Sequence, residues 1–171
     1  MGRLIEFRPF PGLPEPARII YEPEETDLVD PRLRSLYTRW TFDRPEGAAG
    51  ASRDLVDSDE MRPLARNFML LEPVARSDGS HDYIYRIYGP DIAQHYGRDM
   101  TGKRASDFPA GIAMLFMQLY ESAMRNAWPI YSRHAPPKTV KVEYWERLIL
   151  PLGQDHVSWL LVVNLPIGHR A

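Results

Sequence analysis

The segment from His156 to Leu165 constrains the fold more than any other part of the chain. It contains four consecutive apolar residues, Leu160 to Val163. Side chains alternate between the two faces of a strand, so a strand with this composition is apolar on both faces. Such a strand belongs in the centre of a sheet that is covered by helices on one face and by further chain on the other. The sequence therefore predicts a layered protein of mixed α and β structure.

The preceding elements give this layer its order. β-branched and aromatic runs between turn signals predict strands over 68–74, 82–88, 130–135 and 140–152. An apolar stripe at helical spacing predicts one long helix over 111–127, which ends at Trp128-Pro129. Short helical turns are predicted near Ser58, over 91–96 and near Ser106. This order predicts an α+β domain with a five-stranded antiparallel sheet, its short helices and long helix on one face.

The N-terminal part is expected to differ from the rest. Six of the 16 prolines lie within the first 31 residues, so residues 1–26 are predicted to form an extended arm or a loose terminus. Asp30 and Pro31 then begin an amphipathic helix with Leu33 and Trp40 on its apolar face. This helix needs a partner, which is either its own domain or a second copy of the chain. A homodimer through this helix is the prediction. Residues 1–56 form the arm, helix and connector, 57–166 the main domain and 167–171 a tail.

Composition excludes several classes of function. The net charge is −2 and the sequence pI is near 6.2, which argues against a nucleic-acid partner. The chain has no cysteine, so disulfides, thiolate metal sites and cysteinyl nucleophiles are excluded. The longest apolar run, Ile112 to Met117, is far shorter than the ~20 residues that a bilayer requires. The sequence thus predicts a cytoplasmic protein with no membrane partner.

Several short stretches, together with the order of elements, point to a family. They are Asp82 to Gly89, Gly97 to Lys103 and Glu146 to Leu152. With this order, residues 57–166 resemble a PAS domain, and the chain is similar to a family of standalone bacterial PAS-like proteins. The resemblance implies a sensory or ligand-binding module without an established reaction. Only Pro166 to Ala171 follow the last predicted strand, so a signal is expected to leave through a dimer or a separate signalling partner.

The resemblance also limits the cofactor. A flavin that forms a cysteine adduct is excluded, because the chain has no cysteine. Haem in PAS domains is usually bound by a histidine on the long helix or its neighbouring loop, and 111–127 contains none. Haem is therefore not expected, although His95 remains the candidate if it is present. Noncovalent flavin is neither supported nor excluded, so the cofactor stays open.

Two charged residues within apolar strands are the main candidates for a ligand site. Glu146 shares a strand face with Tyr144 and Leu148, and Arg86 shares one with Ile84 and Tyr88. Burial of a polar group without a hydrogen-bond partner costs about 2–7 kcal/mol of folding free energy. Burial of a charge that is neither paired nor solvated costs more. Each is therefore either a ligand contact, a member of a buried pair such as Glu146–Arg86, or turned outward by a β-bulge.

Aromatic residues complete the predicted site. Tyr85, Phe116, Tyr120 and Tyr144 are expected to line a cavity between the sheet and the long helix, with His95 nearby, or else to be ordinary core. The leading prediction is a sensory module that binds a small-molecule ligand or a protein partner. An interaction or dimerisation module with a filled core is the alternative. A small isomerase-like or thioesterase-like enzyme would need an acid or base from Glu146, His95 or Asp99 and is the least favoured.

Overall fold

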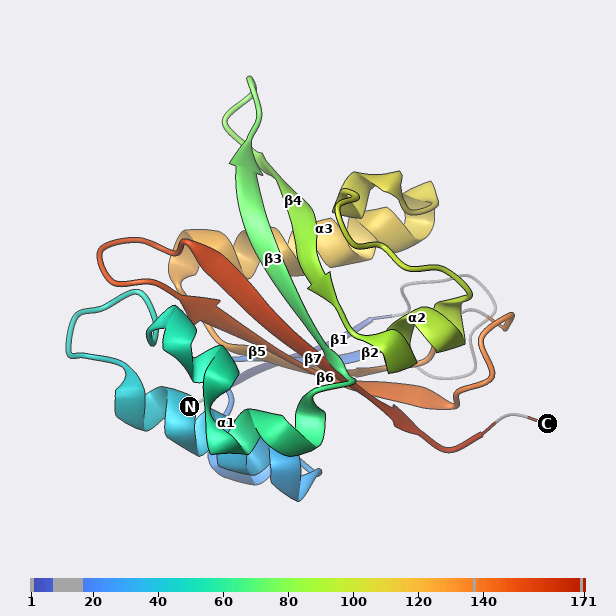
Figure 1. Ribbon diagram of the computed structural model, residues 1–171, viewed down its shortest axis with the longest axis horizontal. Helices are drawn as coiled ribbons and strands as arrows, with labels where there is room; N and C mark the ends of the chain where they lie inside the picture. The colour runs from blue at the N-terminus through green and yellow to red at the C-terminus, as the bar shows by residue number, and fades with distance from the viewer. Residues whose placement is uncertain (1, 8–16, 137, 170) are drawn as a thin grey trace.

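A computed structural model describes residues 2–7, 17–136, 138–169 and 171. It is a mixed α and β structure built on one seven-stranded antiparallel sheet, in which the strands lie in the order β1-β2-β5-β6-β7-β3-β4 (Figure 1). The strands are β1 Arg3–Phe7, β2 Ala17–Tyr21, β3 Phe68–Ala75, β4 His81–Tyr88, β5 Ile130–His134, β6 Tyr144–Leu152 and β7 Trp159–Ile167. The predicted α+β class and antiparallel sheet are confirmed.

The last three strands lie side by side, as the sequence predicts. β6 pairs with β5 on one side and with β7 on the other, and β3 continues the sheet beyond β7. The apolar residues of β7 alternate between two cores, with Leu160 and Val162 on one face and Leu161 and Val163 on the other. Burial on both faces is the reason that this segment is apolar throughout.

The sheet has seven strands instead of the expected five because the N-terminal arm joins it. β2 pairs with β5, and β1 pairs with β2 at the edge. Ile19 and Ile20 of β2 are buried on opposite faces of the sheet, so the arm is anchored by both cores. Most of the proline-rich part of the arm lies at 8–16, outside the described residues. Prolines exclude a helix here but still permit short edge strands.

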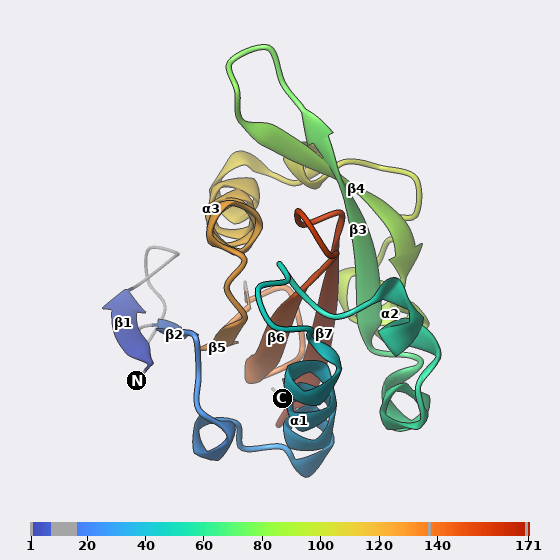
Figure 2. The ribbon, with the colours of Figure 1, turned by 90° about the vertical axis from the view of Figure 1, so that its left-hand side faces the viewer.

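Helices cover both faces of the sheet. The long helix α3, Ala110–Asn126, packs on one face with α2, Pro90–Tyr96, and the turn η4, Ala105–Asp107. The helix α1, Pro31–Asp43, covers the other face with the turns η2, Arg53–Asp57, and η3, Asp59–Leu64. A further turn, η1 at Glu25–Asp27, precedes α1. Figures 1 and 2 show α1 and α3 on either side of the central strands. The short helices are therefore divided between the faces, whereas the sequence predicted them on one.

The helix α1 finds its apolar partner within its own chain. Asp30 caps it by accepting a hydrogen bond from the backbone N–H of Arg32, as predicted. Its buried residues Leu33, Leu36 and Trp40 pack on the sheet, and Trp40 Nε1 donates to the carbonyl oxygen of Pro151. The apolar face that suggested a second copy is thus already covered. The homodimer stays a prediction.

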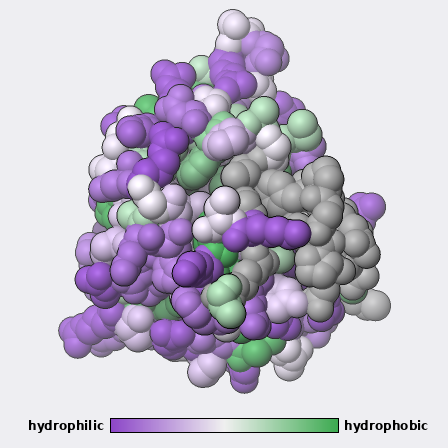
Figure 3. Space-filling view, turned by 90° about the vertical axis from the view of Figure 1, so that its right-hand side faces the viewer, coloured by the Kyte–Doolittle hydropathy of each residue, from purple (hydrophilic) through white to green (hydrophobic). Residues whose placement is uncertain are grey.

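The surface shows little concentration of apolar side chains. Large hydrophobic residues that are exposed among the described residues are dispersed over separate elements, at Leu4, Val29, Phe42 and Met114. On the face shown in Figure 3, hydrophilic side chains predominate among the described residues. Isolated exposed apolar residues are normal for a folded domain.

Gly50 is expected to be intolerant of any side chain. It lies against β6, where a methyl group would overlap the backbone carbonyl of the buried Pro151. We expect Gly50→Ala to lower the free energy of unfolding by about 1–3 kcal/mol, because neither backbone segment can move away. Gly111→Ala is the matched control, since nothing lies near its added methyl and α3 is helical there; it should stabilise by roughly 0.5 kcal/mol. Urea unfolding of both variants measures the difference, and equal effects would contradict it.

Candidate ligand-binding site

Three neighbouring strands place a row of polar side chains beneath α3. Ser132 of β5 lies opposite Arg147 of β6, which in turn lies opposite Asn164 of β7. On each strand the residue two positions away, such as Ile149 or Val162, belongs to the core that packs against α3. His134 follows Ser132 by two residues and therefore shares this face. We call Ser132, His134, Arg147 and Asn164 the polar cluster.

Arg147 is held in place from two sides. Its Nε donates a hydrogen bond to Asn164 Oδ1 over 2.6 Å, and its guanidinium carbon lies 4.3 Å from the centre of the Phe116 ring. Arginine only donates hydrogen bonds, so this contact orients the Asn164 amide with its oxygen towards Arg147. The Asn164 Nδ2 is consequently left as a donor. Arg147 and Asn164 together form a positioned donor pair.

The polar cluster contains buried atoms without hydrogen-bond partners. They are Ser132 Oγ, both ring nitrogens of His134, Arg147 Nη1 and Asn164 Nδ2. More than 90% of buried polar groups in proteins have a partner, and each unpartnered one costs about 1–3 kcal/mol. An ordinary hydrophobic core therefore does not contain several unpartnered polar atoms on neighbouring strands of one sheet face. The arrangement is suited to a polar group that the described residues do not supply.

Arg147 is also a buried charge without a counter-charge. Only 1% of the residue is exposed, and within the described part of the chain no carboxylate forms an ion pair with it. The contrast with Asp82 is informative, because this buried carboxylate accepts hydrogen bonds from Arg76 and Ser106. Burial of an unpaired ion costs several kcal/mol even after relaxation. The position is therefore favourable for an anion.

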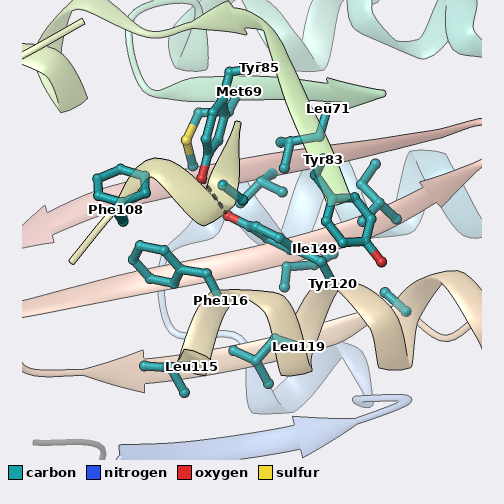
Figure 4. Packing of buried hydrophobic residues seen from close by; sticks show 14 of the residues in the cluster. Met69, Leu71, Tyr83, Tyr85, Phe108, Leu115, Phe116, Leu119, Tyr120 and Ile149 are labelled. Atoms are coloured by element: carbon teal, nitrogen blue, oxygen red, sulfur yellow. Dashed lines mark hydrogen bonds between the residues drawn. The ribbon is translucent and has the colours of Figure 1, made fainter. Parts of the chain in front are cut away.

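Aromatic side chains lie between the sheet and α3 near the polar cluster. Tyr85 of β4 and Tyr120 of α3 point towards each other, with hydroxyl oxygens 3.5 Å apart, and Phe108 and Phe116 lie close by (Figure 4). Burial raises the pKa of Tyr85 well above its ordinary value. Burial raises the pKa of Tyr96, on α2, to about 12. Tyr85 and Tyr96 are therefore neutral at pH 7, and together with the neighbouring rings they provide apolar surface.

His134 is neutral in the folded protein. It is 3% exposed, and burial lowers its pKa well below the ordinary value near 6.5, with the positive charge of Arg147 acting in the same direction. A neutral imidazole has one N–H donor and one acceptor nitrogen. Arg147 is thus the sole cation of the polar cluster.

The neutral state of His134 predicts loss of stability in weak acid. The unfolded chain takes up a proton at His134 near pH 6.5, whereas the folded chain does not, so stability is complete above this pH and declines below it. We expect the free energy of unfolding to fall by about 1.4 kcal/mol between pH 7.5 and 5.5. His134→Leu should remove this dependence. His156→Leu is the control, because His156 is exposed, and it should leave the dependence unchanged in urea titrations; a loss that persists in His134→Leu contradicts the assignment.

Glu146 lies on the opposite face of the sheet from the polar cluster. Its Oε1 accepts hydrogen bonds from the backbone N–H groups of Val29 and Asp30, at 3.0 and 2.9 Å, and from the hydroxyl of Tyr131 at 2.9 Å. The carboxylate therefore holds the chain at the start of α1. The buried charge is satisfied, but by backbone amides and not by the arginine that the sequence analysis considered.

The other candidates divide between the two sides of the sheet and the surface. Arg86 is exposed on β4 and pairs with Glu72, with Nε and Oε2 2.6 Å apart. Tyr144 lies on the same strand face as Glu146, two residues away, and the Arg133 guanidinium lies over the Tyr144 ring. His95 packs on Trp145, and its Nδ1 lies 2.6 Å from the carbonyl oxygen of Asp91. Of the predicted site residues, the structure brings Tyr85 of β4 together with Phe116 and Tyr120 of α3, in the layer between the sheet and this helix.

The polar cluster itself was not singled out by the sequence analysis. Arg147 stands in the same apolar run as Glu146 and raises the same question of an unpaired charge. Ser132, His134 and Asn164 are each unremarkable in their own strand, and only the register of β5, β6 and β7 aligns them. The signal available in the sequence was the pair of adjacent charges, Glu146 and Arg147, one on each face of the otherwise uncharged segment 144–152.

A shallow groove on the surface is a weaker candidate. It lies along the outer side of α3 with a volume of about 610 Å³ and is lined by residues that include Met117, Glu121 and Arg125. Glu121 already accepts hydrogen bonds from Arg125 and from the Tyr83 hydroxyl. The charge there is therefore satisfied without a ligand.

Comparison of the chain with known protein families, with curated proteins and with solved structures gives no match. Among the described residues, no three histidine, aspartate or glutamate side chains converge in a way that would hold a metal ion. The described helices include none with the length and apolar character needed to cross a membrane.

Proposed function

We propose that this chain is a PAS-like sensory module that binds a small ligand between the sheet and α3. The observation that carries the proposal is the polar cluster, in which buried donors and the charge of Arg147 have no partner among the residues that the structure describes. A ligand that supplies hydrogen-bond acceptors there would remove these penalties on binding. Neighbouring aromatic side chains supply the apolar surface that small organic ligands require.

The arrangement of the elements supports the PAS-like part of the proposal. Strands β5, β6, β7, β3 and β4 are consecutive neighbours in the sheet, and α2 and α3 pack on one face of them. These are the elements on which the resemblance of residues 57–166 rests. β1, β2 and α1 are additions around this part.

A path for the signal runs through β6. Arg147 faces the polar cluster, while its neighbour Glu146 faces the other side and holds the backbone at Val29 and Asp30. Adjacent residues of a strand move together, since the peptide between them is rigid. A shift of β6 on ligand binding therefore changes the contact of Glu146 with the start of α1. We propose α1 as the element that presents the change to a separate partner or a second copy.

Binding is favoured over catalysis by the separation of the acid–base candidates. Glu146 lies on the α1 face, His95 lies beside Trp145 on the other face, and Asp99 is exposed and accepts hydrogen bonds from Thr101. An acid and a base that cooperate must lie within hydrogen-bond reach of one substrate.

A screen of stability against metabolites tests the proposal. A ligand present at one hundred times its dissociation constant stabilises the fold by about 2.7 kcal/mol, which is visible as a rise in melting temperature. Hydrogen exchange at the Val29 and Asp30 amides should change in the complex. Unchanged melting over a broad panel would contradict ligand binding. Binding without any change at these two amides would contradict the path through β6.

A further inference from the structure

We infer that the ligand of the polar cluster is a small monocarboxylate with an apolar body. This inference rests on the proposed function and adds the chemical class of the ligand. It follows from three properties of the site: its charge, the kind of hydrogen-bonding atoms that lack partners, and the side chains around them.

The positive charge of the site is balanced by a ligand that carries one negative charge. Arg147 carries the one positive charge of the polar cluster, and His134 remains neutral because burial and Arg147 both oppose its protonation. The other two buried charged residues that the structure describes are already satisfied: Asp82 pairs with Arg76, and Glu146 faces the other side of the sheet. In a buried site, a dianion such as a phosphate ester would retain an uncompensated charge. A monoanion leaves no net charge.

Four of the five unpartnered atoms of the polar cluster can donate, and the fifth is the acceptor nitrogen of the neutral His134 ring. Arg147 Nη1 and Asn164 Nδ2 can only donate, and the Ser132 hydroxyl donates readily. A carboxylate offers two oxygens with about four lone pairs, which is enough to accept from all three. A primary amide of the same shape has one acceptor oxygen and an NH₂ group that would face these donors. The site therefore discriminates in favour of the carboxylate.

The side chains around Ser132, Arg147 and Asn164 require a ligand with an apolar body. Phe116 covers the Arg147 guanidinium, and Phe116 in turn contacts the rings of Phe108 and Tyr120. Tyr85, which is fully neutral, lies beside Phe108. A polar body would lose its hydration there without replacement, whereas an alkyl or aryl group gains contact.

The test compares matched pairs of small probes. Acetate, butyrate, hexanoate, benzoate and phenylacetate are titrated as sodium salts into the wild-type chain, each beside its primary amide and with sodium chloride as the ionic control. Two-dimensional NMR follows the Asn164 side-chain amide. We expect at least one carboxylate with a butyrate-sized or larger body to bind at least ten times more tightly than its amide, and its binding to shift the Asn164 signal.

Two variants test the assignment to the row. Arg147→Met together with Asn164→Leu replaces the donors by apolar side chains of similar volume, and circular dichroism checks its folding. This variant should bind carboxylates at least ten times more weakly. Arg86→Met is the matched control, because Arg86 is an exposed arginine that already pairs with Glu72, and it should bind as the wild type does.

The possible outcomes distinguish failure of the carboxylate assignment from failure of the proposed ligand site. Equal binding of amides and carboxylates, or binding that survives in the double variant, overturns the carboxylate assignment but leaves a ligand site. The same holds if none of the carboxylates binds and a neutral metabolite from the broader panel does. If nothing binds and a high-resolution crystal structure shows ordered water on these donors, both the inference and the ligand site are wrong.

Discussion

Replacement of Arg147 by methionine together with Asn164 by leucine is expected to raise the free energy of unfolding by about 1–4 kcal/mol in the absence of ligand. At these positions the wild type holds a buried cation and two donors for which no counter-charge or acceptor is found among the described residues. Apolar side chains of similar volume remove both penalties and add contacts with Phe116. The same change should eliminate ligand binding, so stability and function oppose each other at this site.

Chemical unfolding in urea at pH 7.5 measures this gain, and the melting temperature should rise in parallel. Arg86→Met is again the control, since an exposed ion pair contributes only about 0–1 kcal/mol and its loss cannot stabilise the fold to this extent. A double variant that is less stable than the wild type would show that the chain itself satisfies Arg147, and the site would then belong to the structural core.

Glu146→Ala is expected to lower the free energy of unfolding by about 2–4 kcal/mol, because three hydrogen-bond donors lose their acceptor. The carboxylate accepts from two backbone N–H groups and one hydroxyl, and its removal leaves three donors without this acceptor, the hydroxyl buried and the two amides partly buried. Because two of these donors lie at the start of α1, the helix should separate from the sheet before the rest of the chain unfolds. Loss of hydrogen-exchange protection confined to α1 would report this at low urea concentration.

Glu146→Gln gives the matched comparison, because it retains an acceptor oxygen and loses only the charge. Its cost should be about 1–2 kcal/mol. Tyr131→Phe removes a single donor and should cost roughly 1 kcal/mol. If alanine and glutamine at position 146 cost the same, the hydrogen bonds to Val29 and Asp30 do not contribute to stability, and the proposed path from Arg147 to α1 loses its physical basis.

The strands and helices were largely predictable because their signals are local. The apolar stripe predicted the long helix over 111–127, and the structure has α3 at Ala110–Asn126. Asp30 and Pro31 predicted the start of α1, and Gly79 predicted the hairpin between β3 and β4. The predicted strand over 140–152 was too long, since β6 begins at Tyr144. Caps, turns and periodicity act over a few residues, so the sequence carries them directly.

The arm was harder to interpret. The extended conformation predicted for it is found in the described strands β1 and β2, but the pairing of β2 with β5 depends on an edge that the sequence does not reveal. In the same way, the apolar face of α1 predicted burial without saying against what. The structure shows that the partner is the sheet of the same chain.

The candidate site shows the same division. The period of two that groups Glu146 with Tyr144 and Leu148 puts the adjacent Arg147 on the opposite face, and the structure has the two side chains there. Glu146 was one candidate for a ligand contact, with a buried pair or a β-bulge as alternatives, because no local feature says which face lies beneath the long helix. The hydrogen bonds from Val29 and Asp30 join segments far apart in the chain, and only the packed structure brings them together.

The amino-acid sequence by itself determined which segments are strands and helices, that the last strand is buried on both faces, and that the charge of Glu146 in β6 requires a partner. These properties follow from side-chain size, polarity and spacing within short segments. The tertiary structure alone decided that α1 covers one face and α3 the other, and that Ser132, Arg147 and Asn164 form one row. Register between strands and the choice of face are set by contacts between distant segments, which no local pattern encodes.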